Sequence, residues 1–69
     1  MKENLKFEDL MFTYSNGDGT MDLEFQTEEH SYILRNVPVP NDIDEFYWDN
    51  EENVKNAIEA ADESDIEVK

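Results

Sequence analysis

The net charge of this chain limits how it can fold more than any other feature of its sequence. Nineteen acidic residues against five basic ones give a formal charge of −14 on 69 residues. Self-repulsion of this size opposes compaction, and a chain this short buries only about 60% of the surface that it exposes when unfolded. Yet 38% of the residues are hydrophobic and 12% are aromatic, more than in a disordered acidic tail. We therefore expect a single folded domain over residues 1–69, with a small core.

Composition also narrows the classes of partner and cofactor. The chain has no cysteine, which excludes disulfides, thiolate zinc sites and a cysteine nucleophile. Residues 1–4 lead into no apolar run of signal-peptide length, and no stretch approaches the roughly 20 apolar residues of a membrane span. A strongly negative surface repels nucleic acid and anionic membranes and attracts basic surfaces. We expect a soluble, cytoplasmic protein that binds neither DNA nor membrane directly and holds no cofactor or metal.

The first half of the chain predicts a β-hairpin. Every second residue is apolar over 20–26, which is the period of a half-buried strand. Residues 10–14 predict a second strand, and residues 15–19 between them contain Asn-Gly and Asp-Gly, which supply the positive φ that a hairpin turn needs. The apolar face of the earlier strand is expected to hold Leu10, Phe12 and Tyr14.

Two further strands are indicated. Residues 31–37 predict a third strand that follows a turn at 28–30, and its apolar residues fall on both parities: Tyr32 and Leu34 on one, Ile33 and Val37 on the other. Two prolines then end the pairing, because proline donates no ladder hydrogen bond. The tail, residues 65–69, alternates in polarity. It can form a short edge strand or fray.

Residues 49–62 predict a helix. Asp49 and Glu52 have the spacing of a capping box, with Asp in place of the usual Ser or Thr. Apolar residues at i, i+3, i+4 and i+7 from residue 54 form one narrow stripe. Together these elements predict an α+β fold, in which a three-stranded antiparallel sheet carries one C-terminal helix on one face. The core is expected to contain Phe7, Leu10, Phe12, Met21, Leu23, Phe25, Leu34, Val54 and Ile58.

Part of the hairpin resembles a calcium-binding loop. Gly19 can stand at the sixth loop position, with Asn16 and Asp18 at ligand positions. The first and twelfth positions then fall to Tyr14 and Phe25, which carry no carboxylate. A hairpin turn is the better interpretation of this segment.

No catalytic group can be assembled from the sequence. His30 is the only histidine, and a lone histidine in a turn lacks the partners that make a general base. With nineteen acids, any pair of carboxylates can be nominated for hydrolysis, so the nomination carries no information. A 69-residue domain also has little room for a substrate cleft. We expect that the protein is not an enzyme.

The carboxylates themselves carry the functional signal. Residues 42–69 contain eleven acids and two bases, a net charge of 2 − 11 = −9. In the predicted helix, Glu52, Glu59 and Glu63 fall opposite the apolar stripe. In the strand at 20–26, Asp22 and Glu24 share the outer face. An ordinary solvated acidic face, or adaptation to high salt, would also produce many acids, but solubility needs a net charge of only about 2–8 in magnitude.

Three consecutive aromatic residues interrupt the acidic region. Phe46, Tyr47 and Trp48 cannot all point inward from one regular element. We expect Phe46 in the core and Tyr47 or Trp48 at the surface, where an aromatic side chain ringed by carboxylates would suit a protein-binding hot spot. A homodimer is an equally good use of such a side chain.

In length, charge, lack of cysteine and interspersed aromatics, the chain resembles the small acidic DNA-mimic proteins, many of them encoded by bacteriophages. The resemblance implies an inhibitor that occupies the DNA-binding surface of a basic host protein, such as a nucleoid-associated protein, during host takeover. The alternative is an acidic adaptor or subunit domain that binds a non-nucleic-acid protein partner. In either case the expected protein-binding residues are Asp22, Glu24, Asp44, Glu45, Tyr47, Trp48, Asp49, Glu51, Glu52, Glu59, Asp62 and Glu63.

Overall fold

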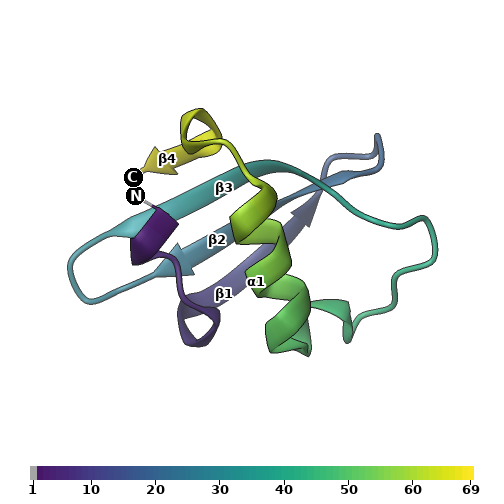
Figure 1. The fold of residues 1–69 in the computed structure, drawn as a ribbon, viewed down its shortest axis with the longest axis horizontal. Coiled ribbons are helices and arrows are strands. Elements are labelled where there is room, and N and C mark those ends of the chain that lie inside the picture. Colours follow the sequence, from purple (N-terminus) through teal and green to yellow (C-terminus); the bar gives the residue numbers. More distant parts are fainter. Residues whose placement is uncertain (1) are drawn as a thin grey trace.

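The computed structural model describes residues 2–69, and it confirms the α+β fold, including the fourth strand (Figure 1). The sheet is antiparallel with the spatial order β1-β2-β3-β4, so that β1 and β4 form its two edges. One α-helix crosses one face of the sheet (Figure 1). The elements are β1 (Leu10–Ser15), β2 (Thr20–Gln26), β3 (Ser31–Pro38), α1 (Glu51–Ala60) and β4 (Ile66–Val68), with short 3-10 turns at Lys2–Asn4, Phe7–Asp9, Tyr47–Asp49 and Glu63–Asp65.

The predicted hairpin is formed by β1, β2 and the turn between them. Gly17 and Gly19 have φ of 79° and 87°, which the glycines of Asn-Gly and Asp-Gly adopt without strain. The Asn16 N–H donates to the Thr20 carbonyl at 3.0 Å. Both side chains that resembled calcium ligands take part in this turn: Asp18 Oδ1 accepts from the N–H and the hydroxyl of Thr20, and Asn16 Nδ2 donates to the Thr20 hydroxyl oxygen.

A bulge in β1 overturns the predicted apolar face of that strand. Leu10 lies opposite Phe25, but Phe12 lies opposite Glu24, so Met11 is an extra residue on the β1 side. An extra residue reverses the alternation of side chains. Phe12 and Tyr14 therefore lie on the face of the sheet opposite α1, and the prediction of Phe12 in the core was wrong: its exposed fraction is 48%.

A second bulge, in β3, explains why the apolar residues of that strand fall on both parities. Leu23 lies opposite Leu34 and Met21 lies opposite Val37, so Arg35 and Asn36 together face one residue of β2. Asn36 adopts a φ of 58°, a conformation that asparagine tolerates better than most residues. The bulge returns Val37 to the same face as Leu34, and both are buried in the core.

The core fills the space between the sheet and α1. Of the nine predicted core residues, five are buried and Phe7, Leu10 and Met21 pack partly buried against them. The sequence prediction missed several buried residues, because they lie in a turn, on the bulged strand or in the short β4. These are Leu5, Tyr32, Val37, Trp48 and Ile66, and Ile33 is also buried, opposite Glu24 in β2.

Helix α1 is shorter than predicted, and its N-terminal cap is a different residue. It spans Glu51–Ala60 rather than 49–62, and Asn50 Oδ1 accepts from the backbone N–H groups of Glu52 and Asn53 at 2.9 and 3.2 Å. The predicted capping box of Asp49 and Glu52 was therefore wrong. Asp49 instead ends the preceding 3-10 turn, so its carboxylate does not cap the helix.

Replacing Asn50 with alanine is expected to lower the free energy of unfolding by about 1 kcal/mol, because two N–H groups at the start of the helix lose their acceptor. The matched variant Asp49→Ala should change stability by less, since Asp49 is not the cap. Chemical denaturation of both variants measures the difference. Equal destabilisation, or a larger loss in Asp49→Ala, would contradict this assignment.

Candidate functional site

The aromatic segment contributes one exposed ring, and it is not the one predicted. Phe46 is the most exposed large hydrophobic residue described, with an exposed fraction of 63%. Trp48 is buried, with an exposed fraction of 8%. Trp48 packs in the core, with its indole Nε1 3.4 Å from the sulfur of Met21. Tyr47 is half-buried and stands edge-on against Trp48, with ring centroids 4.8 Å apart. The expectation of Phe46 in the core was wrong, and Trp48 is not available to a partner.

The most acidic part of the molecule is the stretch that leads from the end of β3 into α1. Residues 42–52 contain six carboxylates and no basic residue, and we call them the acidic segment. Within residues 2–69, Asp42, Asp44, Glu45, Asp49 and Glu52 form no ion pair, and Glu51 only approaches Lys55, at 3.9 Å. Asp44 Oδ1 accepts from the Phe46 N–H at 2.8 Å, which fixes the turn that presents the exposed ring.

The solvent-facing side of α1 continues this acidic surface. Glu51, Glu52 and Glu59 line a shallow hollow of about 390 Å³ together with Lys55 and Asn56. The predicted neighbour Glu63 lies beyond the helix, in the turn Glu63–Asp65. Asp62 caps that turn by accepting from the Ser64 N–H at 3.1 Å. Glu63 stays beside the end of the helix, because Lys2 donates from its backbone N–H to Glu63 Oε1 at 3.0 Å and from Nζ to the Glu59 carbonyl at 2.9 Å.

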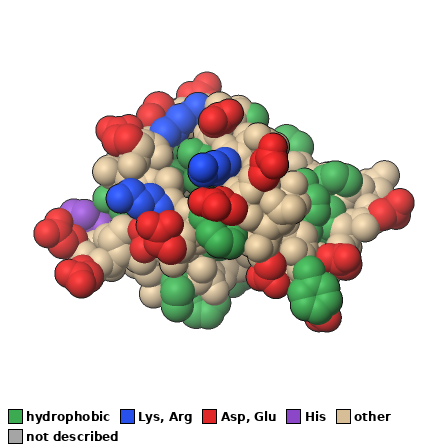
Figure 2. All heavy atoms as spheres, turned by 60° about the horizontal axis from the view of Figure 1, so that its bottom comes forward, with side chains coloured by type: hydrophobic (Ala, Val, Ile, Leu, Met, Phe, Trp, Pro, Cys, Tyr) green, Lys and Arg blue, Asp and Glu red, His purple; other side chains and the backbone are tan. Residues whose placement is uncertain are grey.

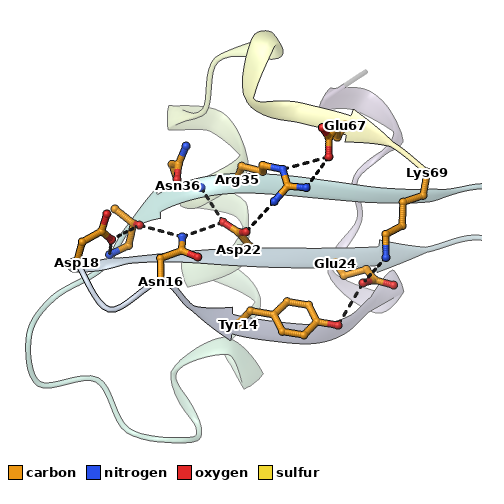
Figure 3. A network of polar contacts seen from close by, with 10 residues as sticks. Tyr14, Asn16, Asp18, Asp22, Glu24, Arg35, Asn36, Glu67 and Lys69 are labelled. Atoms are coloured by element: carbon orange, nitrogen blue, oxygen red, sulfur yellow. Dashed lines mark hydrogen bonds and ion pairs between the residues drawn. The ribbon is translucent and has the colours of Figure 1, made fainter.

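On the other face of the sheet, the acids are paired. Asp22 binds Arg35 at 3.1 Å, and Arg35 also holds Glu67 with two nitrogens, at 2.6 and 3.1 Å (Figure 3). Asp22 Oδ1 also accepts from the Asn36 N–H at 3.0 Å and from the side chain of Asn16 at 2.9 Å. Asp22 thus satisfies the N–H that the β3 bulge leaves without a ladder partner.

Glu24 is the one buried charged residue among those described, and three side chains cover it. It accepts from Gln26 at 2.8 Å and from the Tyr14 hydroxyl at 3.3 Å, and Lys69 Nζ lies 3.5 Å away (Figure 3). Asp22 and Glu24 do share the outer face, as expected. Their charges are compensated by Arg35 and Lys69, so they add little to the external field.

Both carboxyl groups have lowered pKa values. Partial burial alone would raise the pKa of Asp22, but hydrogen bonds from Asn16 and the Asn36 N–H, together with the charge of Arg35, outweigh it and lower the pKa. For Glu24, the hydrogen bond from Gln26 is the largest cause of the lowered pKa, and it acts with Lys69 and Tyr14 against burial. Both groups therefore stay ionised, and bound to their partners, at a lower pH than an ordinary Asp or Glu carboxyl would.

The basic residues are placed unevenly with respect to these acids. In Figure 2, the basic side chains in view gather in the half that carries the only histidine, and the other half shows only carboxylates and hydrophobic groups among its neutral surface. The 39–46 loop, which contains the first half of the acidic segment, projects on that second side (Figure 1). On the face in view, the carboxylates of that second side therefore lie apart from the basic side chains.

Comparison with protein-family models, with curated proteins and with solved structures finds no match for this chain. Across residues 2–69, no helix is both long and apolar enough to cross a membrane. The same residues contain no cluster of three or more histidine or acidic side chains placed to hold a metal ion. The geometry and charge of the surface are therefore the basis for assigning a function.

We expect Asp22→Asn to lower the free energy of unfolding by about 1 kcal/mol at neutral pH, because the change removes the ion pair with Arg35 and weakens the support of the β3 bulge. The pKa of Asp22 is lower in the folded state than the usual value of about 3.9. Its contribution is therefore present above about pH 4 and is lost as the pH falls through the folded-state value.

The difference in free energy of unfolding between wild type and Asp22→Asn should thus be constant from about pH 5 to 8 and vanish at lower pH. Denaturation curves at a series of pH values measure it. Asp42→Asn is the matched control, since Asp42 forms no ion pair in residues 2–69, and its loss should not destabilise the protein. A pH-independent difference for Asp22→Asn would contradict the role given to its charge.

Proposed function

We propose that this protein is an acidic DNA mimic that binds the nucleic-acid-binding surface of a basic protein, such as a nucleoid-associated protein, and blocks its binding to DNA. The observation that carries the proposal is the separation of two kinds of carboxylate. Those on the outer face of the sheet are paired with Arg35 and Lys69, and those of the acidic segment form no close ion pair. A surface that only kept the protein in solution would not need this separation.

The acidic segment adds to the charge that α1 presents, because it extends six carboxylates from the loop into the first turn of the helix. The exposed face of α1 carries Glu51, Glu52 and Glu59 against Lys55, a net charge of −2 along ten residues. Such a helix is about 15 Å long, and B-DNA carries about nine charges over that distance. Glu45 and Asp49, with the other carboxylates of the loop, raise the density at the N-terminal end of the helix.

The mechanism of inhibition follows from this charge. Carboxylates replace phosphates at the lysine and arginine side chains of the target and displace the same counterions, so affinity falls as salt rises. The field of the acidic segment also steers the two proteins together and speeds their association at low salt. DNA and this protein then compete for one basic surface.

Phe46 adds a contact that salt does not screen. Its ring is 63% exposed, directly after Asp44 and Glu45 in the sequence. An apolar ring with a charged rim is the usual composition of a binding hot spot. Phe46 therefore takes the place that the sequence had suggested for Tyr47 or Trp48.

The proposal predicts that Asp44→Asn/Glu45→Gln binds the target more weakly and with a shallower dependence on salt, because two phosphate-like charges are lost. Glu28→Gln/Glu29→Gln is the matched control, since it removes the same charge from the exposed turn between β2 and β3. The target is first captured from a bacterial lysate at low salt, and titrations at several salt concentrations then compare the three proteins.

Addition of DNA to the purified complex distinguishes an inhibitor from an adaptor. Displacement of this protein by DNA supports the mimic. A complex that DNA leaves intact, or recovery of no basic nucleic-acid-binding protein at low salt, would overturn the proposal. Equal losses of affinity in the two double variants would show that net charge, rather than the acidic segment, governs binding.

For Phe46→Ala, we expect the affinity for the target to fall by about 1–2 kcal/mol, and by the same amount at low and high salt, because the lost contact is apolar. Stability should change little, since the ring makes no part of the core. Titration calorimetry together with thermal denaturation checks both points. An unchanged affinity would remove Phe46 from the interface.

A further inference from the structure

The two edges of the sheet differ in how well they are protected. Strand β4 has only three residues and contains Glu67, which binds Arg35. Strand β1 has six residues, with neither a charged residue nor a proline among them. Proteins usually protect edge strands with charges, prolines or short length, because the free backbone groups of an edge pair readily with another strand. The bulge at Met11, a feature that also protects edges, lies at the start of β1, and residues 12–15 beyond it pair regularly with β2.

The surface of β1 is also the least charged part of the chain. Residues 10–17 form the longest run without a charged residue in a sequence of which 35% is charged. Three of its side chains are large, apolar and about half exposed: Met11 at 56%, Phe12 at 48% and Tyr14 at 48%. Phe12 and Tyr14 lie side by side on the outer face, with ring centroids 6.5 Å apart.

The direction of the backbone groups follows from the hairpin. The Asn16 N–H donates to Thr20 of β2. In an antiparallel pair, backbone groups point toward the neighbouring strand at every second residue. Tyr14 and Phe12 therefore direct their N–H and C=O groups to β2, and Thr13 and Ser15 direct theirs away from the sheet.

We infer that the protein forms a symmetric dimer in which the β1 strands of two copies pair antiparallel about a two-fold axis at Thr13. The two copies of Thr13 exchange N–H···O=C hydrogen bonds, and the two sheets become one. Phe12 of each copy then lies opposite Tyr14 of the other, and cross-strand aromatic pairs and facing threonines both favour such pairing. The pairing is self-complementary, as a two-fold interface requires.

Charge is the reason that a second copy, rather than another partner, fits this edge. Two chains of −14 repel each other wherever their acidic surfaces meet. A charge-free strand is the part of the surface on which they can approach. A basic protein gains nothing from an uncharged edge and is expected instead at the acidic segment.

The dimer is expected to be weak and strengthened by salt. A whole aromatic side chain buries about 150–250 Å², so half-exposed Phe12 and Tyr14 offer roughly 200 Å² per chain. This is well below the roughly 800 Å² per partner of a standard interface, and the paired strands have to supply most of the rest. Glu45 and Asp49 line a hollow of about 260 Å³ together with Met11 and Thr13. Pairing therefore brings carboxylates of the two copies closer, and salt screens their repulsion.

Sedimentation of the purified protein over a range of concentrations, in about 0.05 M and about 0.5 M salt, tests the inference. A monomer–dimer equilibrium is expected, with a dissociation constant that falls roughly tenfold at the higher salt. Thr13→Pro should abolish the dimer, because proline removes the outward N–H while leaving the hydrogen bonds to β2. Thr13→Val keeps the N–H and should dimerise as the wild type does.

Thr13→Glu provides a second disrupting variant, since it places like charges opposite each other across the axis. Circular dichroism establishes that each variant is folded. A protein that stays monomeric at both salt concentrations, or a dimer that survives in folded Thr13→Pro, would overturn the inference. A third result would also overturn it: the protein is monomeric, and Thr13→Pro loses the ability to bind a partner protein. The edge of β1 would then be the binding site of that partner. Dimerisation and target binding respond to salt in opposite directions, so failure of one does not imply failure of the other.

Discussion

The placement of five basic residues among nineteen acids is the constraint on which the rest of this structure depends. Arg35 and Lys69 lie on the face of the sheet that α1 leaves uncovered, and they compensate Asp22, Glu24 and Glu67 there. Compensation at this face allows β2, which carries Asp22 and Glu24 on its outer side, to occupy the middle of the sheet. Residues 42–52 contain six further acids and no base, and Lys55 is the only basic residue that approaches them among residues 2–69, at 3.9 Å from Glu51.

Two bulges decide what each face of the sheet presents. The extra residue in β1 moves Phe12 and Tyr14 away from the core, and the extra residue in β3 returns Val37 to it. The β3 bulge is supported by Asp22, which binds the freed N–H and the guanidinium beside it. An acidic residue that the sequence assigned to a binding surface thus has a structural role, and an aromatic residue assigned to the core is available for contacts.

The proposed target interface and the proposed dimer interface use different parts of the surface and different forces. The acidic segment and α1 provide charge, with Phe46 as an apolar contact among the carboxylates. Strand β1 provides an uncharged edge with free backbone groups. Glu45 and Asp49 lie near both, because they line the hollow beside Met11 and Thr13. A dimer would therefore present two acidic segments to a target, which would raise its avidity where both can engage.

The sequence by itself determined the fold class, the hairpin, the third strand, the presence of the helix and five of the core residues, because polar–apolar periodicity and glycine turns act locally. It also placed the acidic region in residues 42–69, which is a matter of composition, and the structure narrowed this region to the unpaired acids of 42–52. Only the tertiary structure decided which acids are paired, since Arg35 reaches Glu67 across 32 positions of sequence. Only the tertiary structure also decided which of Phe46 and Trp48 is exposed. The same holds for the bulges, because one inserted residue reverses which side chains of a strand face the core without altering its composition.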